Sequence, residues 1–440
     1  MHCSWIKNIP SNWERVPFGS LFTQRKSKNQ KLERDFVLSV VKGRGVIPYS
    51  EKGNLGNKVS EDLSKYKLVE TGDFVLNSMN LYMGSVGVSR YEGITSTAYI
   101  VCTPSDRVEA GYYEFVIRCR GFQEYVGLLG KGIMEIREAV RWTALKSVSV
   151  PFPELTTQKR IADFLDRETA RIDQLIEKKQ RLVELLGEKR SATITVAVTK
   201  GLDLDVPMTD SGIKWLGDVP EGWVISPLKR VASIRYGIGE PPSYQEEGTP
   251  LIRATNVNAG SINREGLVLV NPSDIPEKRI IWLLPGDIIV VRSGAYTGDS
   301  AIIRAEHCPC IAGFDMVVHP TACLADFLQY ALLSSYVKKD QLDLKKTRAA
   351  QPHLNSEELG GCILVLPPLS EQSIIVDYLN REIARIDMVL AKTKESIEKL
   401  REFCSALITA AVTGQIDVET WSRRSNTDHR LDAIEEGMHP

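Results

Sequence analysis

Short strings in this 440-residue chain contain residue types that could carry out chemistry. Gly127-Leu128-Leu129-Gly130-Lys131-Gly132 is glycine-rich and basic, like a phosphate-binding loop, but it lacks the spacing G-x-x-x-x-G-K-[ST]. Asn271-Pro272-Ser273-Asp274 is similar to an Asn-Pro-Pro-aromatic loop, but it lacks the second proline and the aromatic ring that would stack on a flipped base. We interpret it as a turn with a proline.

His307-Cys308-Pro309-Cys310 could supply soft metal ligands. However, no second Cys/His pair lies at the spacing of a zinc site, and the six histidines form no cluster. A Gly-x-Ser-x-Gly nucleophile elbow is also missing. The sequence therefore predicts neither a metal site nor a methyltransferase or nuclease built from this chain alone. A carboxylate site assembled by folding stays open as an alternative.

The composition is that of a folded protein with more than one core. Apolar residues make up 43% and charged residues 25%, and the length predicts two domains of roughly 150 residues plus connecting elements. No stretch approaches the roughly 18–20 apolar residues of a membrane span, and residues 1–5 do not form a secretory signal. The scattered cysteines predict reduced thiols in a cytoplasmic protein: Cys3, Cys102, Cys119, Cys308, Cys310, Cys323, Cys362 and Cys404.

Charge is distributed unevenly along the chain. The net charge of −1 argues against a protein that coats nucleic acid indiscriminately. Residues 1–150 hold 21 Lys/Arg against 15 Asp/Glu, whereas residues 206–364 hold 15 against 18. Any contact with nucleic acid must therefore use local basic surfaces, above all in the second half.

An internal repeat is the strongest signal in the sequence. With an offset of 214 positions, Pro153-Glu154-Leu155-Thr156-Thr157-Gln158 aligns with Pro367-Pro368-Leu369-Ser370-Glu371-Gln372. The alignment continues without a gap through Arg167–Asp173 and Arg381–Asp387 to Asp203 and Asp417. Such a match in one register is far beyond chance.

Both copies of the repeat predict a long helix. Thr156 and Ser370 are candidate N-caps, and a heptad-like apolar stripe follows from Leu165 and from Leu379 without an interior proline. Some 40 residues at 1.5 Å each give a rod of about 60 Å. Two rods with one apolar stripe each pack most simply on each other; two independent core helices are the alternative.

The segments before the helices are related more weakly. Gly72–Leu76 matches Gly286–Val290 at the same offset, and Tyr82-Met83-Gly84 matches Tyr296-Thr297-Gly298. Each Gly-Asp pair predicts a turn into a short buried strand. Because the two domains then end differently, the sequence predicts a tandem duplication in which the helices stayed alike while the domains diverged.

The motifs around the helix starts are similar to those of a known family. Residues 151–158, followed by Ile161 and a long helix, resemble the central region of type I restriction–modification DNA specificity subunits. Residues 366–372 resemble the C-terminal region, and Gln351–Asn355 resembles the stretch that often precedes it. The resemblance spans nearly the whole chain. The first copy departs from the commoner Pro-Pro-Leu-x-Glu-Gln, and the first domain lacks a counterpart of Gln351-Pro352-His353.

This resemblance implies an α+β fold. Two globular α/β target-recognition domains with mixed sheets would be separated by two long antiparallel, coiled-coil-like helices in a pseudo-twofold tandem repeat. We expect the first recognition domain at 1–155, the central helix at 156–204, the second domain at 205–368, the C-terminal helix at 369–417 and a disordered tail at 418–440.

The resemblance also implies partners and cofactors. Each recognition domain would read one half of a bipartite, asymmetric sequence in double-stranded DNA, and the helices would fix the gap between the halves. Two methyltransferase subunits would dock on the helices and methylate adenine with S-adenosylmethionine. Restriction subunits that use ATP and Mg²⁺ could join to cut unmodified DNA. The chain itself would hold no cofactor and no catalytic residue.

Candidate DNA-binding residues are basic or amide side chains in loops, since Arg pairs with guanine and Asn or Gln with adenine. Any one of them could instead be a solvated surface residue. In the first domain they are Lys42, Arg44, Asn77, Ser78, Asn80, Lys131, Arg137 and Arg141. In the second domain they are Arg253, Asn256, Arg292, Ser293, Lys345, Lys346, Arg348 and Gln351.

Candidate contacts with the methyltransferase are apolar helix residues that remain exposed once the helices pair. They are Ile161, Phe164, Ile375 and Tyr378; packing into the adjoining recognition domain is the alternative. Two other functions stay open: a tandem-domain protein scaffold that binds no DNA, and an enzyme with an unrecognised site. Salt-dependent DNA binding would argue against the first, and methyl transfer by the chain alone would support the second.

Overall fold

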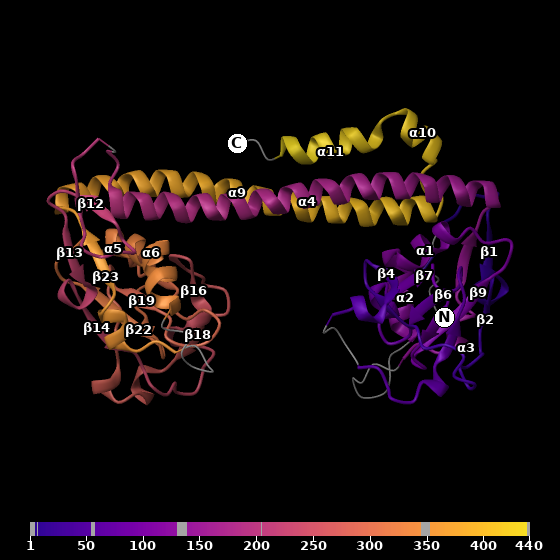
Figure 1. Ribbon diagram of the computed structural model, residues 1–440, viewed down its shortest axis with the longest axis horizontal. Coiled ribbons are helices and arrows are strands. Elements are labelled where there is room, and N and C mark those ends of the chain that lie inside the picture. The colour runs from indigo at the N-terminus through magenta and orange to yellow at the C-terminus, as the bar shows by residue number, and fades with distance from the viewer. Residues whose placement is uncertain are drawn as a thin grey trace. The chain divides into compact units, whose positions relative to one another are not determined.

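The computed structural model describes residues 5–6, 8–53, 58–129, 139–203, 205–344 and 353–437. By its internal contacts the chain divides into two units. The first contains Met1–Gln180 and Lys392–Pro440, and the second contains Arg181–Ala391. Two long helices, α4 (Leu155–Lys200) and α9 (Leu369–Val412), each contribute one half to each unit (Figure 1).

The two long helices pair within each unit. In the first unit, Leu165 and Ile172 from the start of α4 share a core with Leu400 and Leu407 from the end of α9. In the second unit, Ile194 and Val198 from the end of α4 share a core with Leu379 and Ile386 from the start of α9. The helices are therefore antiparallel, as predicted, and each apolar stripe is buried by the other helix and by a domain.

The domain of the first unit contains two four-stranded sheets. One has the order β2-β9-β6-β7 with antiparallel neighbours; the other has the order β4-β3-β8-β5 with β3 and β8 parallel. The strands are β1 (Glu14–Pro17), β2 (Phe22–Gln24), β3 (Val37–Val41), β4 (Gly45–Pro48), β5 (Lys67–Val69), β6 (Phe74–Asn77), β7 (Val86–Val88), β8 (Gly93–Thr95), β9 (Tyr99–Pro104) and β10 (Ser149–Phe152), and the helices are α1 (Ala110–Arg118), α2 (Arg120–Leu129) and α3 (Trp142–Leu145).

The domain of the second unit repeats this plan with the sheets β14-β22-β19-β20 and β18-β15-β21, in which β15 and β21 are parallel. The strands are β11 (Met208–Asp210), β12 (Asp218–Pro220), β13 (Val224–Pro227), β14 (Ala232–Tyr236), β15 (Thr249–Ile252), β16 (Val257–Asn258), β17 (Ser261–Ile262), β18 (Val268–Val270), β19 (Ile288–Val290), β20 (Ser300–Ile302), β21 (Ile311–Ala312), β22 (Met316–Pro320) and β23 (Ile363–Leu366), and the helices are α5 (Ala325–Leu333), α6 (Ser335–Val337), a π-helical turn (Lys338–Asp343) and α8 (Ser356–Gly360). The shared strand order confirms the duplication of the domains.

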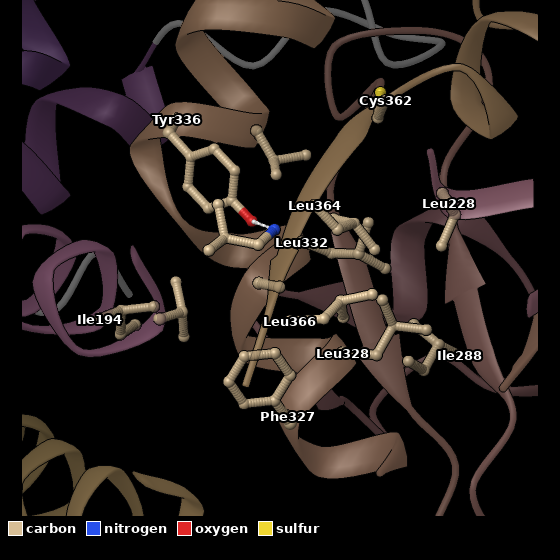
Figure 2. Close-up of a cluster of buried hydrophobic side chains, with 14 of the residues drawn as sticks. Ile194, Leu228, Ile288, Phe327, Leu328, Leu332, Tyr336, Cys362, Leu364 and Leu366 are labelled. Carbon is tan, nitrogen blue, oxygen red and sulfur yellow. Dashed lines mark hydrogen bonds between the residues drawn. The ribbon is translucent and has the colours of Figure 1, made fainter. Parts of the chain in front are cut away.

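The core of the second unit shows how a long helix joins its domain. Figure 2 shows Phe327, Leu328 and Leu332 of α5 beside Leu364 and Leu366 of β23, all members of the cluster that also contains Ile194 of α4. The buried Tyr336 hydroxyl accepts a hydrogen bond from the Val365 amide at 3.4 Å. Side chains from α4, α5 and β23 thus form one continuous core.

The repeated Gly-Asp pairs form the predicted turns. Gly72 and Gly286 adopt positive φ angles of 89° and 95°, which favour glycine. The next residue is a buried aspartate whose carboxylate accepts a hydrogen bond from the backbone amide three residues earlier. Asp73 accepts from the Glu70 amide and Asp287 from the Leu284 amide, both at 2.9 Å. The next strand, β6 or β19, enters the core directly after this turn.

A buried glutamine fastens the start of each long helix to its domain. The Gln158 amide donates to the Pro153 carbonyl at 2.9 Å and accepts from the Glu109 amide at 2.8 Å, just before α1. Gln372 repeats both bonds, to the Pro367 carbonyl at 2.8 Å and from the Leu324 amide at 2.9 Å, just before α5. The repeated glutamine therefore sets where each helix leaves its domain.

The C-terminal tail differs from the predicted disorder. Residues Val418–Arg423 form α10 and Asn426–Glu436 form α11. The Asp417 carboxylate caps α10 by accepting the Glu419 and Thr420 amides, and Leu431 of α11 is buried in the core of the first unit. The prediction failed because the charged composition of the tail hides a few apolar residues that pack on the helix pair.

We expect Gln372→Ala to lower the free energy of unfolding by about 1–3 kcal/mol, because it leaves a buried carbonyl and the Leu324 amide without their partner. Thermal unfolding of the full chain measures this. Ser373→Ala, an exposed neighbour on the same helix, is the control and should change stability by less than about 0.5 kcal/mol. Equal stabilities of the two variants would contradict a role for the glutamine in fastening the helix.

Candidate nucleic-acid interface

Arg292 lies at one end of the antiparallel sheet of the second unit, just after β19. The pairing of Val290 and Tyr236 with Met316 brings the ends of β19 and β14 to the start of β22. This register places Arg292 between two rings, with its guanidinium 4.6 Å from the centroid of Tyr236 and 4.4 Å from that of Phe314. We call these three side chains the arginine clamp.

The arginine clamp is accessible to a large ligand. Tyr236 and Phe314 are 41% and 43% exposed, and cation–π contact restrains the partly buried Arg292 between them. Its backbone is fixed as well, since the Arg292 amide donates to the Asp315 carboxylate at 3.1 Å. The hydrogen bond from Ser356, aided by the charge of Arg292, lowers the pKa of Tyr236, and burial raises the pKa of Asp315.

His353 connects the arginine clamp to the stretch that precedes the second long helix. Arg292 Nη2 donates to His353 Nε2 at 3.1 Å, so Nδ1 carries the proton and donates to Ser293 Oγ at 3.0 Å. The Leu354 amide also donates to the Arg292 carbonyl at 2.8 Å. The end of β19 and the described part of the predicted stretch, His353 to Asn355, therefore meet at this point.

Arg253 and Asn256 form part of a turn in the fold. Asn256 is buried; its side-chain oxygen accepts from the Arg253 amide at 3.1 Å, and its nitrogen donates to the Asn263 carbonyl at 3.2 Å. The predicted contact of Asn256 with a base is therefore wrong, because its amide is already satisfied. Arg253 donates to the Gly266 carbonyl at 3.0 Å and lies over the exposed Tyr244 ring.

The corresponding strand end in the first unit borders a cavity of about 480 Å³. Asn77 at the end of β6 pairs with Tyr99, and both line the cavity together with Asn80 and Lys42. The Asn77 side chain accepts from the Met79 amide at 3.2 Å. Nearby, the Lys67 ammonium donates to the Tyr99 carbonyl, and burial, with repulsion from Lys28, lowers the pKa of Lys67. The cavity is thus lined by amide, lysine and aromatic groups.

Other predicted residues of the first unit have different positions. Ser78 is buried and donates to the Ala98 carbonyl, so its predicted DNA contact is wrong. Arg44 is exposed in the β3–β4 hairpin and donates to the Glu51 carbonyl at 3.0 Å, and Arg141 is exposed just before α3. The remaining predictions lie outside the described residues: Lys131, Arg137, Lys345, Lys346, Arg348 and Gln351.

Sequence reasoning missed the aromatic partners of both surfaces. Tyr236, Phe314 and His353 surround Arg292, and Tyr49 lines the cavity of the first unit with Lys52 and Lys58. One signal was available: Tyr236 is followed by glycine and Phe314 is preceded by glycine, which marks aromatic residues at strand ends. Charged and amide residues by themselves indicate the loops, but not the aromatic residues at the strand ends.

The predicted partner contacts are mostly core residues. Ile161 and Phe164 are buried in the first unit and Ile375 is buried in the second, while Tyr378 is partly buried against the same core. Their prediction as exposed contacts is therefore wrong for the three buried residues. The apolar face of each helix is wider than a heptad seam because it packs on a domain as well as on the other helix.

The structure shows no helix that could span a membrane within the described ranges. In the same ranges, no group of three or more His, Cys, Asp or Glu side chains is arranged to hold a metal ion.

The family model described as "Type I restriction modification DNA specificity domain" matches the chain twice, at residues 10–185 and 220–399. The chain therefore belongs to the type I restriction–modification specificity family. The two matches each contain one recognition domain and the start of one long helix. This confirms the resemblance that rested on the motifs around Gln158 and Gln372.

Curated relatives and solved structures agree with this family. The chain is 23% identical over 428 residues to the MjaVIII specificity subunit of Methanocaldococcus jannaschii, covering 93% of this chain and 94% of that one. It is 21% identical over 290 residues to the EcoKI specificity subunit of Escherichia coli K12, covering 64% and 60%. The HsdS subunit from Thermoanaerobacter tengcongensis shares the fold, with a TM-score of 0.52 at 17% identity over 93% of this chain and 98% of that one. A chain from a study of complex assembly in a type I R-M system gives a TM-score of 0.66 at 17% identity, covering 93% of this chain and 100% of that one.

We expect Asn256→Ala to lower the free energy of unfolding by about 1–3 kcal/mol and to leave base preference unchanged, because its amide bonds only to the backbone. Thermal unfolding and DNA binding by the same preparation test both parts. The exposed Asn258→Ala is the control and should keep normal stability. A stable Asn256→Ala variant with an altered base preference would restore the DNA-reading role.

Proposed function

We propose that the chain is the non-catalytic reader of a type I restriction–modification enzyme, in which each recognition domain reads one half of a bipartite, asymmetric DNA sequence. The observation that carries this proposal is the pair of related strand ends. The ends of β6 and β19 correspond at an offset of 214 in domains of the same strand order, yet they present different side chains. Two readers of one design with different contact groups suit a target with two unlike halves.

Arg292 is suited to recognise guanine in the second half-site. A guanidinium can donate two parallel hydrogen bonds to guanine O6 and N7 in the major groove. The two rings of the arginine clamp already restrict the Arg292 side chain, so it loses less conformational entropy when it binds a base. Arg292 Nη1 has no partner within the described part of the chain, so it can donate to a base.

Asn80 is the corresponding candidate in the first domain. Its side chain lines the cavity, and no hydrogen bond of its amide group occurs among the described residues. An asparagine amide pairs with adenine N6 and N7. Lys42, Lys52 and Lys58 around the same cavity supply positive charge for the neighbouring phosphates.

The proposal extends to the assembled enzyme. Two methyltransferase subunits would dock on the long helices and the flanking domain surfaces, and they would bind S-adenosylmethionine and methylate adenine. Restriction subunits that use ATP and Mg²⁺ would join them to cut unmodified DNA. The helices would fix the gap between the half-sites, and the assembled enzyme would work in the cytoplasm.

A modified-base map of the host genome tests the proposed function, with this gene intact and deleted. We expect deletion to abolish N6-methyladenine at one bipartite, interrupted motif. An unchanged map in cells that express the methyltransferase would overturn the proposal and favour a protein scaffold.

We expect Arg292→Ala to weaken binding to the cognate sequence by roughly 5- to 150-fold, the loss of one bidentate base contact of about 1–3 kcal/mol. Arg292→Lys should lose nearly as much, since lysine keeps the charge but not the planar fork. Competition between cognate and unrelated duplexes measures the effect. Arg235→Ala, an exposed arginine on β14, is the charge-matched control and should keep its preference. Full rescue by lysine would instead indicate a phosphate contact.

We expect Asn80→Ala to relax recognition at one position of the first half-site, because it removes the amide that pairs with the base. The modified-base map of cells that carry this variant should show degenerate sequence in one half only. The other half is the internal control. Relaxation in both halves, or in the half that Arg292 governs, would contradict independent reading by the two domains.

A further inference from the structure

The same seven-residue pattern occurs once on each long helix. Arg-Glu-x-Ala-Arg-Ile-Asp spans residues 167–173 on α4 and 381–387 on α9. The isoleucine of each copy is buried, whereas the two arginines of each copy are exposed. We call the exposed sides the first arginine face (Arg160, Arg167, Arg171) and the second arginine face (Ile374, Arg381, Arg385, Met388).

The tail of the chain covers the first arginine face. Glu419 of α10 pairs with Arg160, and Asp428 of α11 pairs with Arg171. Arg167 Nη2 also donates to the Ser422 hydroxyl at 3.2 Å. Every basic side chain of this face thus has a partner in the tail.

Apolar packing supplements these ion pairs. Leu431 is only 4% exposed and belongs to the core of the first unit, and Ile434 packs against the same core. About two helical turns beyond Arg171 on α4, Lys179 pairs with Glu435 at 3.7 Å. The tail is therefore an acidic amphipathic segment that matches this face in both charge and apolar contact.

The second arginine face has no such cover in the described structure. Arg381 has no hydrogen-bond or ion-pair partner there, and Arg385 pairs with Glu382 of its own helix at 2.7 Å. Ile374 is 61% exposed and Met388 is 53% exposed. Among the described residues, the chain therefore covers this surface in one copy of its repeat and leaves it open in the other.

We infer that the second arginine face is a docking surface for an acidic amphipathic helix of a partner subunit, and that the tail is the chain's own occupant of the first. The inference rests on the proposed function for the identity of the partner, the methyltransferase subunit. A partner that uses the same helix at both faces must displace the tail from the first. The two methyltransferase subunits then load in order, the second face before the first.

The contacts of the tail suit an occupant that can be displaced. Its ion pairs are at the surface, with about half of each Arg160 and Arg171 side chain exposed, so salt screens them. The hydrogen bond from Arg171 lowers the pKa of Asp428. Tail release should therefore become easier as ionic strength rises.

Titration of the full chain with the purified methyltransferase subunit, followed by native mass spectrometry, tests the inference. For the intact chain we expect two binding constants that differ by about tenfold or more. A chain that ends at Asp417 should bind both copies with nearly equal affinity, because the first face is then open. Leu431→Asp should have the same effect without shortening the chain.

Two further variants assign the sites. Asp428→Arg should raise the weaker affinity, while Asp432→Arg is the matched control because Asp432 is an exposed tail residue without an ion pair in the described structure. Arg381→Glu combined with Arg385→Glu should remove the tighter site.

Equal constants for the intact chain, or no change on tail removal, would overturn the inference and leave the proposed function standing. Failure of the methyltransferase to bind any form would overturn both. Amide hydrogen exchange over residues 418–436 gives an independent readout. Protection in the free chain that disappears only at the second equivalent of methyltransferase is the expected result.

Discussion

The buried amide at the start of each long helix is the contact on which the arrangement of each unit depends. Gln158 and Gln372 each join the first turn of a helix to the loop before α1 or α5. Since an unpaired buried amide or carbonyl is costly, this joint resists small rotations of the helix. The orientation of the helix then fixes which of its apolar residues pack on the domain. The other long helix contributes side chains to the same core. The identical joint in both copies explains why the helix starts stayed alike while the domains changed.

Much of the architecture could be predicted from the sequence because the relevant forces are local. The heptad-like stripes and the Gly-Asp turns depend on residues close together in the chain, and the repeat at an offset of 214 shows that both patterns occur twice. The strand order could not be predicted, since β3 pairs in parallel with β8 across some fifty residues of sequence. The tail was wrongly predicted to be disordered, because the burial of Leu431 depends on contacts with distant helices.

The candidate site shows the same limit. The end of β19 could be identified because Gly286–Val290 aligns with Gly72–Leu76 in the repeat. Arg292 and Ser293, which follow this strand, could therefore be proposed from the sequence. Their partner His353 is sixty residues away in the chain, and only the fold brings it near. Asn256 and Ser78 have the residue types of DNA readers, but their polar groups already bond to the backbone. Residue type shows what a side chain can bind, whereas burial decides whether it is still free to do so.

The charge of the chain bears on how recognition would be achieved. A reader that binds mainly through phosphates gains affinity for any sequence, and its preference for one sequence is then diluted by the many competing sites. The second domain is acidic in sequence, with 15 Lys/Arg against 18 Asp/Glu in residues 206–364, so it cannot rely on general attraction. Its partly buried Arg292 is instead held between the rings of Tyr236 and Phe314. A guanidinium that is held in one orientation loses less conformational entropy when it binds a group that fits this orientation. This favours a base edge with the matching geometry over phosphate groups that approach from other directions. An acidic domain with a restrained arginine can thus be selective for sequence without binding DNA strongly everywhere.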